Sequence, residues 1–112
     1  MRIRLLLLTA TLTLAALISV AGVDRADAAR GCGSIHVHGA AVHVHVLRGV
    51  VPCPTARRIL RGYATATTPC QGSSCLRPIG NWTCQTASYF DFPRLASCDR
   101  HTRWIAAYST AD

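Results

Sequence analysis

The strongest chemical signal in this 112-residue sequence is a group of four histidines within residues 35–46, where apolar and polar residues alternate. The segment is nearly palindromic about the Ala40–Ala41 bond, as expected for a hairpin that turns there. Alternation along both strands would then place all four imidazoles on one face, in two cross-strand pairs. Converging imidazole nitrogens can hold Zn or Cu. We therefore expect a binding or structural metal site formed by His36, His38, His43 and His45.

Two other interpretations of the histidines stay open. The first is an ordinary solvated strand face, which the poor turn chemistry of Ala-Ala favours, since a two-residue turn prefers Asn-Gly. The second is a pH-responsive cluster, because imidazole titrates near neutral pH and close imidazolium groups repel each other. A single strand kinked at Gly39 would instead place the two histidine pairs on opposite faces.

Catalytic patterns are weak, and the sequence predicts that the protein is not an enzyme. No serine lies in a Gly-x-Ser-x-Gly elbow, and the carboxylates after residue 28 come only from Asp91, Asp99 and Asp112. The segment around Cys98 and His101 is similar to the Cys-x-x-His-Asp region of secreted phospholipases A2. Thr102, however, stands where that family has its calcium-binding Asp.

Six cysteines in a short chain with an export signal predict three disulfides. The cysteines alone allow many pairings, and spacing does not choose among them. A flexible polar tetrapeptide separates Cys70 from Cys75, and Cys84 and Cys98 fall in segments with strand character. The favoured set is therefore Cys32–Cys53, Cys70–Cys75 and Cys84–Cys98.

The first 28 residues have the order of a secretory signal peptide. A basic start is followed by the uncharged residues 5–23 and then by the small residues Ala26 and Ala28. We expect cleavage after Ala28, a secreted domain at residues 29–112 and no membrane span after cleavage. The alternative is an uncleaved anchor, because 19 uncharged residues could barely span a bilayer.

The charge balance is cationic, with a formal net charge of +7. The first 28 residues hold three of the twelve Arg and two of the five Asp, which leaves nine Arg against three Asp. Such a domain could bind an anionic surface or an extracellular protein. Arg57, Arg58 and Arg61 form the one local cluster, and there is no specific nucleic-acid motif. A large enzyme and a multi-pass membrane protein are excluded by length.

The elements that must position these residues fit one small domain. Helical spacing of Ala56, Ile59, Leu60 and Tyr63 predicts a helix over 54–65. Composition predicts a loop over 65–78 and strands over 79–86, 88–92 and 103–108. With the hairpin, this order predicts a small disulfide-stapled α+β domain with one helix packed on a short antiparallel sheet.

Residues 50–108 resemble a loose group of small exported actinobacterial proteins of unknown function. The shared features are the Cys-x-x-Ala-Arg helix start at Cys53, a Gly-x-Trp-x-Cys strand ending at Cys84, and a final cysteine at Cys98 before a closing strand. The resemblance implies export and implies no activity. The function expected from the sequence is therefore a non-catalytic binding or structural module. The alternatives are a Zn- or Cu-binding exported protein and a secreted inhibitor or effector that presents the loop clipped by Cys70 and Cys75 to a partner enzyme.

Overall fold

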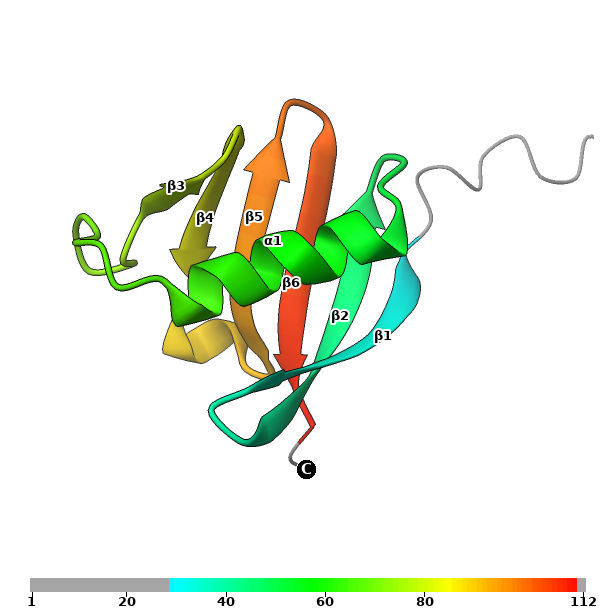
Figure 1. Cartoon of the computed structure of the whole chain (residues 1–112), viewed down its shortest axis with the longest axis horizontal. Helices are drawn as coiled ribbons and strands as arrows, with labels where there is room; N and C mark the ends of the chain where they lie inside the picture. The colour runs from blue at the N-terminus through cyan, green and yellow to red at the C-terminus, as the bar shows by residue number, and fades with distance from the viewer. Residues whose placement is uncertain (1–28, 111–112) are drawn as a thin grey trace, which may run out of the picture.

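A computed structural model describes residues 29–110, which form one helix packed on a six-stranded antiparallel sheet (Figure 1). The predicted α+β class is confirmed, whereas the predicted signal peptide at 1–28 lies outside the described residues. No helix among residues 29–110 is long and apolar enough to cross a membrane. The elements in chain order are β1 (Arg30–Val37), β2 (Ala40–Arg48), α1 (Cys53–Thr65), β3 (Arg77–Ile79), β4 (Trp82–Thr86), the 3-10 helix η2 (Tyr89–Asp91), β5 (Arg94–Arg100) and β6 (Arg103–Ser109).

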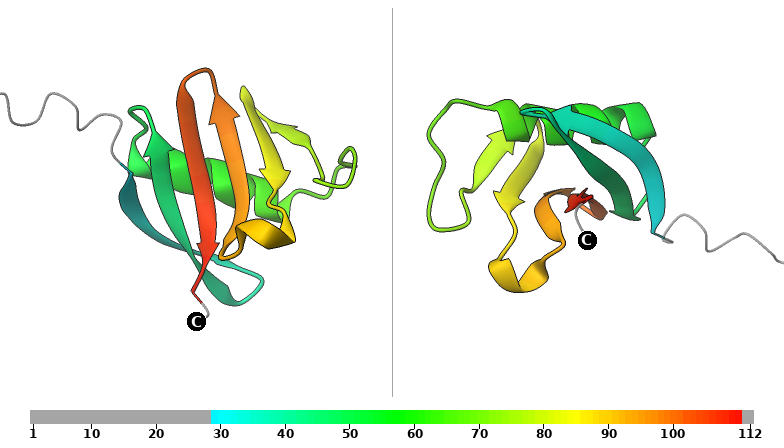
Figure 2. Two further views of the ribbon diagram at one scale, coloured as in Figure 1. Left: turned by 180° about the vertical axis from the view of Figure 1, so that it is seen from behind. Right: turned by 90° about the horizontal axis from the view of Figure 1, so that it is seen from below.

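The strands lie in the order β1-β2-β6-β5-β4-β3, with every neighbouring pair antiparallel. The last strand of the chain, β6, therefore lies between β2 and β5. It joins the N-terminal hairpin to the three strands that follow α1. Viewed from below, α1 lies against one face of the curved sheet, and β5 and β6 turn their other face away from it (Figure 2).

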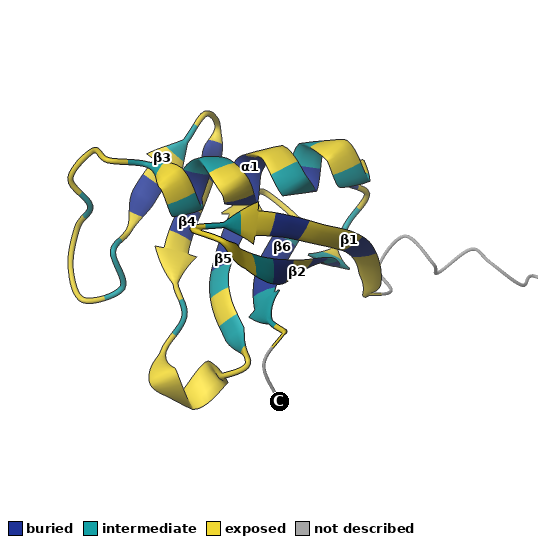
Figure 3. Cartoon of the chain, turned by 60° about the horizontal axis from the view of Figure 1, so that its bottom comes forward, coloured by how far each residue is buried: buried dark blue, intermediate teal, exposed yellow. Residues whose placement is uncertain are grey.

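The helix forms where its apolar spacing predicts, within one residue of the expected start. Pro54 lies in its first turn, where the missing N–H costs no hydrogen bond. One face of α1 is buried against the sheet, and the opposite face is exposed (Figure 3). The buried helix residues are Ala56, Ile59, Leu60 and Tyr63. The sheet side of the core is built from Ile35, Val42, Val44, Val46, Trp82, Cys84, Cys98, Ile105 and Ala107.

The first hairpin turns two residues earlier than the palindrome predicts. His38 and Gly39 form the turn, with φ values of 49° and 82°. A type I′ turn requires a positive φ at both central residues, and these two values meet that requirement. His36 lies opposite Ala41, and Ile35 lies opposite Val42. The prediction of a turn at Ala40–Ala41 is therefore wrong, because the backbone freedom of Gly39 decides the register instead of the symmetry of the side chains.

The second half of the sheet also differs from the sequence prediction. The single strand expected over 79–86 is two strands, β3 and β4, separated by a turn at Gly80 and Asn81. The strand expected over 88–92 is wrong, since this segment contains η2. The hydroxyl of Ser88 accepts a hydrogen bond from the backbone N–H of Phe90 at 3.2 Å, which starts a helical turn rather than a strand.

The three disulfides join the favoured pairs. Cys32–Cys53 ties β1 to the start of α1, and Cys84–Cys98 joins residues directly opposite each other on β4 and β5. Cys70–Cys75 closes a short loop before β3. Every cysteine of the chain is therefore bonded. Three disulfides indicate that the protein folds in an oxidising compartment.

Candidate partner-binding surface

The four histidines do not form the expected rectangle, because the observed register separates them. His38 is in the turn, His43 lies opposite Ser34, and His45 lies opposite Gly31. No two of the four are direct cross-strand partners. Across residues 29–110, no group of three or more His, Cys, Asp or Glu side chains is arranged to hold a metal ion. The predicted pairing of His36 with His45 and of His38 with His43 is therefore wrong, and the structure shows no cluster in residues 29–110 where these four side chains would hold Zn or Cu together.

Two of these histidines have protein partners instead. The Nδ1 atom of His43 lies 3.2 Å from the hydroxyl of Ser34. The ring of His45 packs edge-on against Tyr108 of β6, with 5.0 Å between ring centroids. His36 and His38 are exposed. The histidines thus contribute to strand pairing and to a turn, rather than to one common centre.

The three arginines of the cluster on α1 also differ in their surroundings. Arg57 donates a hydrogen bond to the carbonyl oxygen of Cys32 at 2.8 Å and thereby ties the helix to β1. Arg58 and Arg61 are exposed. The cluster is therefore a structural contact and two solvated side chains, and it does not build an anion site by itself.

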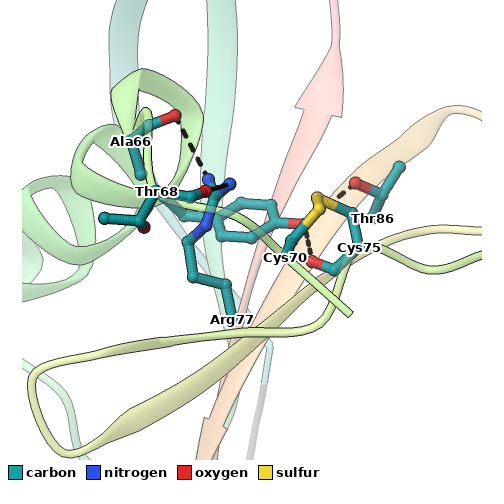
Figure 4. Close-up of a disulfide and its surroundings, with 7 residues drawn as sticks. Ala66, Thr68, Cys70, Cys75, Arg77 and Thr86 are labelled. Atoms are coloured by element: carbon teal, nitrogen blue, oxygen red, sulfur yellow. Dashed lines mark hydrogen bonds between the residues drawn. A yellow bond between two sulfur atoms is a disulfide. The ribbon is translucent and has the colours of Figure 1, made fainter. Parts of the chain in front are cut away.

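The loop clipped by Cys70 and Cys75 is held at both stems (Figure 4). Gln71 and Leu76 exchange two backbone hydrogen bonds, at 2.9 and 2.8 Å. The buried guanidinium of Arg77 donates to the carbonyl oxygens of Ala66 and Thr68 and lies over the ring of Tyr63. These contacts fix the loop against the end of α1, so the disulfide closes a loop that is already positioned.

A second loop, between β4 and β5, exposes three aromatic side chains. Tyr89 is 88% exposed, Phe90 is 91% exposed and Phe92 is 57% exposed. They lie on and beside η2, which is exposed throughout and projects from the end of the sheet (Figure 3). Burying such side chains is ordinarily favourable by about 1.5–3 kcal/mol each. Their exposure on a folded domain makes this loop a candidate interaction surface.

The backbone of this aromatic loop is held by hydrogen bonds and an ion pair, although its side chains are exposed. Asp91 pairs with Arg94 at 3.1 Å, which closes the loop across three residues. The backbone N–H of Ala87 donates to the carbonyl oxygen of Leu95, and that of Ser109 donates to Pro93, each at 2.8 Å. The aromatic side chains are therefore presented from a backbone anchored to both β5 and β6.

The two loops are neighbours. The backbone N–H of Thr86 donates to the carbonyl oxygen of Ser74 at 2.7 Å. A hollow of about 340 Å³ lies between the loops and is bounded on one side by Ser73 and Ser74 and on the other by Ser88 and Tyr89. We call residues 70–75 and 88–93 together the two-loop surface. The first loop was expected from the sequence and the second was not, although Ser88 and Pro93 are turn residues on either side of the aromatics.

Comparison of the chain with protein-family models, with curated proteins and with solved structures finds no match. The fold is that of a small disulfide-rich α+β domain, and the two-loop surface lies at one end of its sheet.

Proposed function

We propose that the protein is an exported, non-catalytic binding protein whose two-loop surface docks into a cleft of an extracellular partner protein. The observation that carries this proposal is the near-complete exposure of Tyr89 and Phe90 on a hydrogen-bonded loop. Residues 1–28 would direct export, and the three disulfides are consistent with that destination.

A tied aromatic loop supports binding because it lowers the entropic cost of association. Aromatic side chains dominate the energy of protein interfaces and have few rotatable bonds to immobilise. The backbone around Tyr89 and Phe90 is already fixed, so little additional ordering is needed when a partner covers them. The neighbouring disulfide-clipped loop extends the same surface, and it too is anchored before any partner arrives.

The charge of the aromatic loop favours a protein partner over a lipid surface. Membrane-binding segments combine aromatics with unpaired basic residues that contact anionic headgroups. Here the loop carries a carboxylate, Asp91, and the adjacent Arg94 is already paired with it. An anionic bilayer would repel Asp91, whereas a cleft with apolar subsites would accept Phe90 and leave the ion pair at its rim.

Several features support a non-catalytic role. All six cysteines are in disulfides, so the chain offers no thiol nucleophile. Of the two side-chain carboxylates in residues 29–110, that of Asp91 is paired with Arg94.

The shape of the two-loop surface favours inhibition of a partner enzyme as the form of binding. Two anchored loops that project from one end of a sheet can fill a concave active site.

The test uses the secreted protein with a photo-crosslinking amino acid at position 90. Irradiation in culture medium of the producing organism should yield one discrete protein adduct. Immobilised protein should capture the same species, and Phe90→Ser should abolish that capture. Val50→Ser is the matched control, because Val50 is also an exposed apolar residue, at 65%, but lies between β2 and α1. Equal capture by the two variants, or adducts with lipid alone, would overturn the proposal.

A further inference from the structure

The face of the sheet that α1 leaves uncovered contains a groove of about 360 Å³ along β5 and β6. Its chemistry differs from that of the two-loop surface, because charged rather than aromatic side chains dominate it. The side chains that matter here are Arg48, Arg94, Asp99, His101, Arg103 and Trp104. Three guanidinium groups and one imidazole therefore face one carboxylate across a small space.

Trp104 organises the groove. It lies directly opposite Arg48 on β2 and opposite Asp99 on β5. The guanidinium carbon of Arg48 is 5.9 Å from the centre of its indole ring, and that of Arg94 is 5.3 Å away. Both distances are within the range of cation–π attraction. One indole thus holds two guanidinium groups beside the same groove.

The packing under Trp104 shows that this arrangement is built into the sheet. Ser97 and Ala106 are paired across β5 and β6 on the uncovered face, since their neighbours Cys98, Ile105 and Ala107 point into the core. Yet Ser97 is only 5% exposed and Ala106 is fully buried. Larger side chains of the same face must cover them. Small residues at these two positions leave room above them for the side chains of Trp104 and Arg94, which line the same groove as Ser97.

The guanidinium groups retain unused hydrogen-bonding capacity. The Nε atom of Arg94 is buried without a hydrogen-bond partner among the described residues, although one terminal nitrogen binds Asp91 at 3.1 Å. Arg48 and Arg103 form no ion pair within residues 29–110, and both are exposed. Guanidinium groups present forked N–H donors that match carboxylate and phosphate oxygens.

We propose that this groove binds a small ligand with two anionic oxygen groups, either a diphosphate or a dicarboxylate. Its volume is at the small end of the range for ligand sites, which fits a single small molecule. Arg48 and Arg103 would bind one anionic group, and the terminal nitrogen of Arg94 that does not pair with Asp91 would contribute to the second. Asp99 would accept a hydrogen bond from a ligand hydroxyl and would disfavour ligands that place a further anion beside it.

The test is calorimetric titration of the secreted protein with pyrophosphate and with succinate, each at low and at physiological ionic strength. We expect saturable binding of one molecule per chain for at least one probe. Preference for pyrophosphate identifies a phosphate site, and preference for succinate identifies a carboxylate site. Absence of saturable binding by both probes would overturn the proposal.

Matched charge variants separate a site from general attraction to a cationic protein. Arg48→Gln and Arg103→Gln should each weaken binding roughly tenfold or more, the loss expected for a charge-assisted hydrogen bond. Arg58→Gln removes the same charge from the exposed face of α1 and should change the affinity less than about twofold. Equal losses at Arg48, Arg103 and Arg58 would show a diffuse electrostatic effect and contradict the proposal.

A fourth variant tests the carboxylate. Asp99→Asn removes the one negative charge among the groove residues named above while retaining the size of the side chain, so it should tighten binding of both probes. Circular dichroism and the unfolding midpoint of each variant establish that the fold is intact before affinities are compared. An Asp99→Asn variant that folds normally and binds more weakly would mean that the anion does not lie beside Asp99.

Discussion

The phenol of Tyr63 donates a hydrogen bond of 2.7 Å to the backbone carbonyl oxygen of Cys75. Because that carbonyl takes the phenolic proton, the hydroxyl of Thr86, 2.9 Å away, must be the donor in its own bond to Tyr63. A single side chain at the buried face of α1 therefore joins the helix, the disulfide-clipped loop and the end of β4 (Figure 4).

Replacing Tyr63 with Phe should lower the free energy of unfolding by about 0.5–1.5 kcal/mol, because the carbonyl of Cys75 and the hydroxyl of Thr86 lose their hydrogen bonds to the phenol. Urea unfolding followed by circular dichroism measures the change. Tyr89→Phe removes the same hydroxyl from a side chain that is 88% exposed, and its unfolding midpoint should not move. An equal effect at both positions would exclude a specific role for the Tyr63 hydroxyl.

Arg77 is a buried cation that satisfies backbone oxygens rather than a carboxylate. Arg77→Met should leave the carbonyl groups of Ala66 and Thr68 without these donors and cost about 1.5–3 kcal/mol, the range for hydrogen bonds to charged groups. Limited proteolysis should then cut within residues 66–76 faster than in the wild type. Arg61→Met, on the exposed face of α1, is the control and should stay within about 0.5 kcal/mol. Unchanged proteolysis of the Arg77 variant would contradict the anchoring role.

The disulfides should differ in their contribution to stability. The loop-entropy model gives about 2 kcal/mol for the five-residue separation of Cys70–Cys75 and about 3 kcal/mol for the fourteen-residue separation of Cys84–Cys98. Cys84 and Cys98 are also fully buried, so replacing both with Ala removes core packing as well. Thermal unfolding of the two double-alanine variants should show the larger loss for Cys84 and Cys98. The reverse order would mean that the clipped loop supports more of the fold than its contacts suggest.

The turn of the first hairpin offers a stabilising change. His38 has a φ of 49°, a region that Asn tolerates better than His. His38→Asn should therefore raise the free energy of unfolding by about 0.5 kcal/mol, since it creates the Asn-Gly sequence preferred in type I′ turns. His36→Asn makes the same replacement within β1, where Asn is disfavoured, and should be neutral or destabilising. Stabilisation at position 36 instead of 38 would contradict the observed register.

The helix and the overall class were predictable because each rests on a local pattern. The apolar spacing of Ala56, Ile59 and Leu60 has no competing signal, and a helix of this length needs one broad face to bury. The hairpin register was not predictable from side-chain symmetry. The palindrome and the turn chemistry of His38-Gly39 point to different registers, and the backbone conformation decides between them.

The two proposed binding surfaces were harder to predict, for two different reasons. Phe90 and Phe92 have the composition of a buried strand, so their exposure depends on a helical turn capped by Ser88. The groove depends on Arg48, Arg94 and Trp104, which come from three strands whose order in the sheet differs from their order in the chain. No local sequence pattern predicts that these three residues lie together, because they are brought together by the position of β6 between β2 and β5.

That placement of β6 has a consequence for the order in which the sheet can form. Synthesis delivers the N-terminus first, so β2 and β5 are both available before the strand that pairs with each of them. Val42 of β2 cannot pair with β6 until Ser109 has been synthesised, and Cys98 of β5 cannot do so until Ile105 has been synthesised. The sheet therefore cannot close around β6 until the segment that forms β6 has been synthesised. If the chain is exported as proposed, its sheet is still open at this position during most of its passage across the membrane.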